Sequence, residues 1–237
     1  MSVCAIHQPN FFPWLGYFDK IRRADHFVFL DGVAYPKSGN SMSSWVNRVR
    51  IAVNGEAVWI RAPVVRESGE QIIRGVRIDD SAPWRDKIVR TLEINYRRAP
   101  RFEPCMALME PLIRHRCEWL ADYNVNAVTR LAAALGLQGK FVRQSALDVK
   151  GHSTELLVDL VRALGASTYL SGDGAEGYQQ DELFARHGIG LERLNFIPRS
   201  YAASAAFVPG LSVIDFLMHC EPASFRTLVS GHDRAKH

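Results

Sequence analysis

Polar side chains with catalytic potential gather in three segments, and each segment directly follows an apolar run. His7, Gln8, Pro9 and Asn10 follow residues 3–6, Asp31 follows residues 26–30, and Ser171, Gly172, Asp173 and Gly174 follow residues 168–170. An imidazole titrates near neutrality and can act as a general base. A carboxylate can hold an imidazole, a metal ion or a ribose, and a glycine-rich turn presents N–H groups that can cradle an anion.

Each segment also has a plainer interpretation. His7 and Asn10 could hydrogen-bond the loop backbone and stabilise a turn, and Asp31 could be a solvated carboxylate at a strand end. The segment 171–177 matches neither the phosphate loop ending in Gly-Lys-Ser/Thr nor G-x-G-x-x-G. Asp173 and Glu176 would repel a phosphate there unless a cation intervened. A site is therefore indicated by the position of all three segments, each of which follows directly after a predicted strand.

A second polar group lies in or beside an alternating segment and consists of Lys37, Asn47, Arg48 and Arg50. In a strand, Arg48 and Arg50 would share one face, opposite Asn47. Two guanidiniums on one face could hold a phosphate or carboxylate bidentately, and a solvated outer face is the alternative. Aromatic side chains of residues 11–18 could stack a base or sugar or fill the core.

The elements around these residues predict an α/β fold. Apolar runs at 3–6 and 26–30 flank a segment in which Leu15, Phe18 and Ile21 have helical spacing, which is typical of a βαβ unit. Further strands are predicted at 141–147, 167–172 and 188–196. A helix over 153–165 is predicted to be capped by Ser153 or Thr154 and to end at Gly165. This alternation at both ends of the chain favours a three-layer core with a parallel sheet.

The middle of the chain differs in pattern. Residues 33–80 alternate polar and apolar side chains, and Asn54-Gly55 separates two alternating runs, which indicates a hairpin with a type I′ turn. Residues 82–135 have helical periodicity. We therefore expect a single α/β domain over 1–237 with a β-hairpin excursion at 33–80 and a helical insertion at 82–135. Ligands of open α/β sheets bind outside the carboxyl ends of the strands, so the three polar segments should meet at one edge.

Composition narrows the classes of function. The chain has 237 residues, 47% of them hydrophobic, and 29 Lys and Arg against 25 Asp and Glu give a net charge of +4. This surplus of positive charge is small and the basic segments are scattered, so the sequence does not favour a nucleic-acid partner. The start resembles no secretory signal and no apolar run is long enough to cross a membrane, so a cytoplasmic protein without a membrane partner is expected. The four cysteines form no C-x-x-C pair, and no metal site is predicted.

Six segments taken together resemble the WbqC-like family over nearly the whole chain. They are IHQPNFFPWLGYFDKI, HFVFLDGVAYPK, WVNRVRI, NGEAVWIRAPV, LVRALGASTYLSGDGAEGY and GLSVIDFLMHC. Two departures are visible: Ala52 stands where the family commonly has Lys, and Asp173 stands where it often has Pro.

The resemblance implies a link to surface polysaccharide or specialised-metabolite gene clusters. Some family members are labelled as glycine or aminoacyl transferases that act on amino sugars. The resulting expectation is an enzyme, an aminoacyl or acyl transferase that forms an amide or related acyl bond on an amino sugar or small amine. Its partner would be this small-molecule substrate.

In this hypothesis each candidate residue has a role. His7 deprotonates the attacking amine or positions the acceptor, Gln8 and Asn10 orient a carbonyl, and Asp31 holds His7 or binds substrate. Lys37 and Arg50 neutralise a phosphate or carboxylate of the substrate, and Asn47 beside them also binds substrate. The other side of the site is closed by the Tyr178 hydroxyl and by the backbone of Ser171, Gly172, Asp173 and Gly174.

Two alternatives stay open. One is a nucleotidyltransferase or an ATP-dependent ligase-like enzyme that uses a nucleotide and Mg²⁺ near Asp31 or Asp173. The opening strand, histidine loop and helix look distantly like nucleotidylyltransferases of the HIGH type, although the second His and the Gly between the two are absent. The other alternative is a non-catalytic sugar-binding module.

Overall fold

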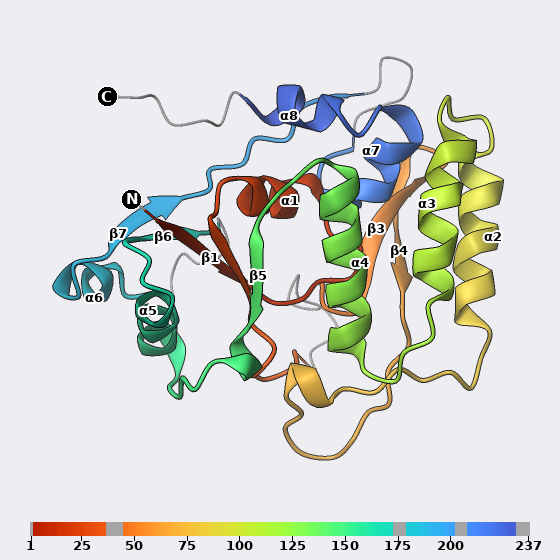
Figure 1. Cartoon of the computed structure of the whole chain (residues 1–237). Helices are drawn as coiled ribbons and strands as arrows, with labels where there is room; N and C mark the ends of the chain where they lie inside the picture. Colours follow the sequence, from red (N-terminus) through yellow and green to blue (C-terminus); the bar gives the residue numbers. More distant parts are fainter. Residues whose placement is uncertain (1, 37–44, 173–178, 202–207, 231–237) are drawn as a thin grey trace.

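The core of the protein is a five-stranded sheet in which every neighbouring pair is parallel (Figure 1). The computed structural model describes residues 2–36, 45–172, 179–201 and 208–230. The strands are β1 (Val3–His7), β2 (His26–Phe29), β5 (Lys140–Arg143), β6 (Thr168–Ser171) and β7 (Gly190–Arg193), and their order across the sheet is β5-β2-β1-β6-β7. The predicted α/β class with a parallel sheet is confirmed.

Helices cover both faces of this sheet because the inner strands are apolar on both sides. Cys4 and Ile6 of β1 pack in one cluster with α5 (Ser153–Ala163) and α6 (Asp181–Arg186). Ala5, between them in sequence, faces the other cluster with α1 (Leu15–Arg22). Figure 1 shows α1 on one side of the sheet and α5 and α6 on the other. Strands buried on both faces are typical of parallel sheets.

The ends of α5 test two local predictions. Gly165 adopts φ +63° just after the helix, and the Ala166 N–H donates to the Val161 carbonyl at 3.1 Å, so the predicted glycine stop is confirmed. The predicted cap at Ser153 or Thr154 is wrong: the helix begins at Ser153, and no side chain caps it. The Thr154 hydroxyl instead accepts the Gln180 N–H at 3.1 Å, a contact from a distant segment.

The Asn-Gly signal correctly predicts the hairpin of β3 (Arg48–Val53) and β4 (Glu56–Arg61). Asn54 and Gly55 have φ values of +52° and +82°, as a type I′ turn requires. The later alternating run at 71–79 does not form a described strand. It contains a 3₁₀ turn, η2 (Ile73–Gly75), because the N–H groups of Ile73 and Arg74 donate to the carbonyls of Val33 and Asp31.

The helical segment at 84–134 consists of α2 (Trp84–Tyr96), α3 (Phe102–Arg114) and α4 (Leu120–Ala134). The chain closes with α7 (Val213–His219) and α8 (Ser224–Val229). None of the helices in the described ranges is long and apolar enough to cross a bilayer.

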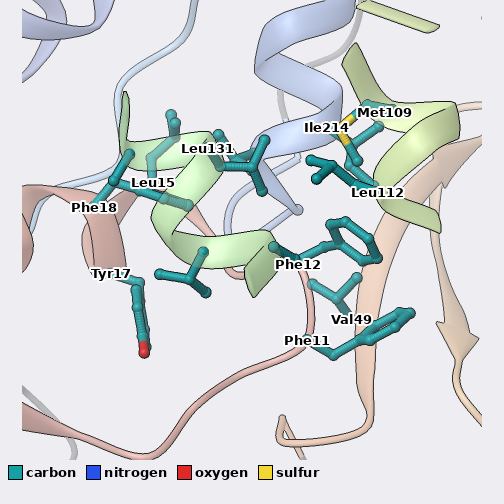
Figure 2. Packing of buried hydrophobic residues seen from close by; sticks show 14 of the residues in the cluster. Phe11, Phe12, Leu15, Tyr17, Phe18, Val49, Met109, Leu112, Leu131 and Ile214 are labelled. Carbon is teal, nitrogen blue, oxygen red and sulfur yellow. The ribbon is translucent and has the colours of Figure 1, made fainter. Parts of the chain in front are cut away.

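The loop after β1 is held in place by this helical segment. Phe11 and Phe12 are fully buried and pack among Val49, Leu112 and Ile214 (Figure 2). The aromatic pair is therefore part of the hydrophobic core, and its packing explains the aromatic run without a ligand. The neighbouring backbone is bound by Asn124 of α4, whose amide donates to the Pro9 carbonyl at 2.8 Å and the Val46 carbonyl at 2.6 Å.

Replacing this amide should loosen the loop. Asn124→Ala leaves the Pro9 and Val46 carbonyls buried without their donor, and we expect it to lower the free energy of unfolding by about 2 kcal/mol. Urea denaturation measures this loss. Asn126→Ala, a half-buried amide on the same helix, serves as the control and should change the free energy by less than about 0.5 kcal/mol. Equal midpoints for the two variants would contradict the assignment.

Candidate functional site

The sheet order places a topological switch point between β1 and β6. From β1 the chain adds β2 and then β5 on one side, and it later returns to add β6 and β7 on the other. Crevices outside the carboxyl ends of strands at such a point are the usual ligand sites of open α/β sheets. His7 ends β1 and Ser171 ends its neighbour β6. The predicted meeting of these two segments at one edge is therefore present, and their catalytic use stays a prediction.

The His7 ring is neutral and half-buried between two aromatic rings. Its centroid lies 4.7 Å from that of Tyr17 and 5.7 Å from that of Trp14. Nδ1 lies 3.3 Å from the Gln8 carbonyl oxygen. Because a carbonyl only accepts, this contact assigns the proton to Nδ1 and the lone pair to Nε2.

Burial, with help from the positive charge of Lys20, lowers the pKa of His7 to about 3. The expectation that this imidazole titrates near neutrality is therefore wrong, since the charged form is disfavoured both by desolvation and by a like charge. A base with so low a pKa is weaker than free imidazole. At neutral pH the ring offers Nε2 as a hydrogen-bond acceptor.

Lys20 is a part of this edge that sequence reasoning missed. It is only 2% exposed, and its ammonium donates to the Ile6 carbonyl at 2.7 Å. A Cβ added at Gly172 would lie 3.6 Å from Nζ, so the ammonium sits beside the turn after β6. Helical spacing could have indicated that Lys20 is buried, because it lies three residues after Tyr17 on the buried side of α1. Lysine is rarely fully buried unless it is paired, and the Ile6 carbonyl is one such partner here.

Ser171 is fully buried, and its hydroxyl is fixed by neighbours at the same edge. It accepts a hydrogen bond from Arg193 at 3.2 Å and donates to the Gln179 amide oxygen at 3.0 Å. Arg193 ends β7 and also pairs with Asp181 at 2.5 Å. Arg193 is a second cation that the sequence analysis did not single out, and only the strand order reveals its proximity to Ser171.

Asp31 does not hold His7. It is fully buried, and its two oxygens accept the Ser145 N–H at 3.0 Å and the Ser145 hydroxyl at 2.8 Å. The carboxylate points to the turn η3 (Gln144–Ala146) after β5, the strand on the far side of β2 from β1. The prediction that Asp31 holds His7 is therefore wrong, and its contact with substrate stays a prediction. Gly32 strengthens this connection by donating its N–H to Gln144 at 3.0 Å.

Two amides of the loop after β1 remain candidates for substrate contact. Gln8 is half-buried, and its backbone carbonyl accepts the Tyr17 hydroxyl at 3.0 Å. Asn10 is 2% exposed, and its side-chain oxygen has no hydrogen-bond partner within the described residues. Buried polar atoms without partners are rare, and a bound water or ligand is a common reason for them.

The hairpin residues Asn47 and Arg50 contact other groups of the protein. The Asn47 amide donates to the Ala62 carbonyl at 3.1 Å and so stabilises the start of the hairpin. Arg50 lies over the Trp45 ring, with 5.7 Å from its guanidinium carbon to the centroid. Trp45 contacts Trp14 with a centroid distance of 5.2 Å, and Trp14 contacts His7. Two indole rings therefore connect Arg50 to the imidazole.

Four predicted site residues lie outside the described residues: Lys37, Asp173, Gly174 and Tyr178. Within the described ranges, no group of three or more His, Cys, Asp or Glu side chains is arranged to hold a metal ion.

The low pKa of His7 predicts how stability depends on pH. The folded state binds this proton only near pH 3, whereas the unfolded chain binds it below about 6.5. Stability from this group is therefore complete above pH 6.5 and falls as the pH drops towards 3. Between pH 7 and pH 5 the wild type should lose about 2 kcal/mol more unfolding free energy than His7→Gln.

Urea unfolding at the two pH values measures this difference. The exposed His187 supplies a control, since His187→Gln should show the same pH dependence as the wild type. A His7→Gln variant that loses as much stability as the wild type would contradict the burial of a neutral imidazole.

Comparisons with known proteins identify the family of the chain. The WbqC-like protein family model matches residues 8–227, a range that includes the loop after β1 and the turn after β6. The chain is also 29% identical over 223 residues to "Uncharacterized protein Rv1507c" of Mycobacterium tuberculosis (strain ATCC 25618 / H37Rv), covering 92% of this chain and 94% of that protein. No solved structure matches the chain. The extent of the family match leads to one conclusion: the chain belongs to the WbqC-like protein family.

Proposed function

We propose that the protein is a transferase that forms an amide or related acyl bond on an amino sugar or small amine. Its reaction belongs to polysaccharide or specialised-metabolite biosynthesis, where amine-bearing sugars are common acceptors. One observation carries the proposal: a neutral imidazole, His7, and a buried ammonium, Lys20, lie together at the switch point between β1 and β6.

The ammonium suits a reaction in which negative charge develops on a carbonyl oxygen. When an amine attacks an activated acyl group, that oxygen becomes an oxyanion. Fixed positive charge in a site with little water stabilises an oxyanion strongly. Lys20, fixed by the Ile6 carbonyl beside Gly172, supplies such charge at the edge of the sheet.

The imidazole suits the proton transfer that accompanies this attack. In the free protein, Lys20 and burial keep His7 unprotonated. An oxyanion beside Lys20 offsets the positive charge and so favours protonation of the ring. Nε2 would then take the proton that the attacking nitrogen loses, so proton uptake is coupled to the appearance of negative charge. When the oxyanion collapses, the bond between the acyl carbon and the leaving group breaks, and the ring gives this proton to the departing group.

Removing the imidazole should reduce turnover more than stability. A general base contributes about 10²- to 10⁴-fold, and we expect His7→Ala to lower kcat within that range. The assay follows the amide product by mass spectrometry, with a panel of aminoacyl donors and amino sugars as substrates. His187→Ala is the matched control and should retain full activity. A His7→Ala variant with normal turnover and reduced stability would make the ring a structural element of the loop.

The sheet order favours a second candidate, nucleotidyl transfer or ATP-dependent activation. A central first strand with a switch point beside it is the arrangement in which open α/β sheets bind nucleotides. Asp31 is a poor Mg²⁺ ligand for this reaction, because both of its oxygens are occupied by Ser145.

Nucleotide titration separates the two candidates. Acyl transfer from a preformed donor predicts no Mg²⁺-dependent heat when ATP or CTP is titrated into the protein in a calorimeter. Saturable, Mg²⁺-dependent binding that is lost in Lys20→Met would favour nucleotidyl transfer or ATP-dependent activation instead. Lys87→Met, which changes an exposed lysine of α2, controls for the loss of one positive charge.

A further inference from the structure

A cleft of about 620 Å³ lies away from the residues of the switch-point site. Its walls are the Asn54-Gly55 turn, residues 94–100 at the end of α2, residues 200–201 and the inner side of α7. None of the described candidate residues of the switch point lines it. Its volume lies within the range of about 300–1,000 Å³ that small-molecule sites occupy.

A buried carboxylate is part of the lining of this cleft. Asp215 is 5% exposed and accepts the hydroxyl protons of Tyr96 at 2.7 Å and Tyr201 at 2.6 Å. The Tyr96 oxygen in turn accepts the Ala52 N–H at 2.9 Å. These contacts hold the carboxylate in one position against the cleft, where it is part of the lining.

This carboxylate has little positive charge near it. Within the described residues, the one basic side chain within 4.0 Å is His219, whose Nδ1 lies 3.9 Å from Asp215 Oδ1. That nitrogen lies closer, at 2.8 Å, to the Asp215 backbone carbonyl, to which it donates. Buried charges are normally paired. Two phenol hydroxyls occupy two of the roughly four acceptor positions of a carboxylate, so it can still accept from a cation in the cleft.

Two other residues of the lining carry the opposite charge. Arg97 and Arg98 follow α2, are exposed and line the cleft. In the described part of the chain, no Asp or Glu lies within 4.0 Å of either guanidinium. Guanidiniums bind phosphate and carboxylate groups with two parallel hydrogen bonds.

From this separation of charge we infer that the cleft is a second ligand site for a small zwitterion. A primary amine of the ligand pairs with Asp215, and a phosphate or carboxylate group binds Arg97 and Arg98. An amine-bearing sugar phosphate has both groups and fits the volume. This inference does not depend on the reaction proposed for the switch point.

Calorimetric titration of the full chain with three related sugars tests the proposal. We expect saturable binding of glucosamine 6-phosphate. Glucose 6-phosphate, which lacks the amine, and glucosamine, which lacks the phosphate, should each bind at least tenfold more weakly. Absence of glucosamine 6-phosphate binding at millimolar concentration, or equal affinity for all three sugars, overturns the proposal. These titrations need only the wild-type protein.

Variants assign each end of the ligand. Asp215→Asn keeps the size of the side chain and removes its charge, so it should weaken glucosamine 6-phosphate binding at least tenfold and leave the weaker glucose 6-phosphate binding unchanged. Arg97→Gln combined with Arg98→Gln should weaken binding of both phosphates. Arg90→Gln, an exposed arginine elsewhere on α2, is the charge control. Unchanged affinity in a folded Asp215→Asn variant overturns the assignment of the amine.

His7→Ala separates this inference from the proposed reaction. The substitution should leave glucosamine 6-phosphate binding unchanged, because His7 does not line the cleft. Binding that is lost in His7→Ala and retained in Asp215→Asn would place the ligand at the switch point and overturn the second site.

Discussion

Strand β1 hydrogen-bonds to β2 on one edge and to β6 on the other, and the rest of the structure depends on this double pairing. It makes the first strand of the chain the centre of the sheet. It also brings residue 7 beside residues 171–172, although more than half of the chain lies between them. The intervening residues supply the hairpin, the helices α2 to α4 and the strand β5. Within these residues, Asn124 binds the loop after β1 through the Pro9 carbonyl, and the edge between β1 and β6 is the candidate site.

The chemistry of this edge follows from burying two nitrogen groups of different basicity close together. The Lys20 ammonium is stabilised by the Ile6 carbonyl, whereas the His7 ring has aromatic neighbours and a single backbone contact. Burial, and after it the positive charge of Lys20, lowers the pKa of His7 and keeps the ring neutral. The edge therefore combines a fixed positive charge with a neutral acceptor. The lining of the cleft beside α7 has the reverse arrangement, with the buried Asp215 carboxylate and the exposed guanidiniums of Arg97 and Arg98.

Features that depend on a few neighbouring residues could be predicted from the sequence. Apolar runs and helical spacing identify the opening βαβ unit, because a strand or helix buried on one or both faces needs that periodicity. Asn54-Gly55 identifies the hairpin and Gly165 the end of α5, since both positions require φ above zero. The parallel class follows from alternation of strands and helices. With it comes the expectation that polar residues at strand ends share one edge, which the positions of His7 and Ser171 bear out.

The sequence by itself thus determined the fold class, the turns and the loops in which a site could lie. Tertiary structure alone decided which side chains in those loops are available for chemistry. The Thr154 hydroxyl is engaged by Gln180, and the Asp31 carboxylate by Ser145, over separations that no local pattern reports. Helical spacing indicates that Lys20 is buried, but only the tertiary structure places its ammonium beside Gly172 and lowers the pKa of His7. The physical reason is that periodicity reports which residues are buried, whereas protonation and hydrogen bonding depend on the neighbours that distant segments supply.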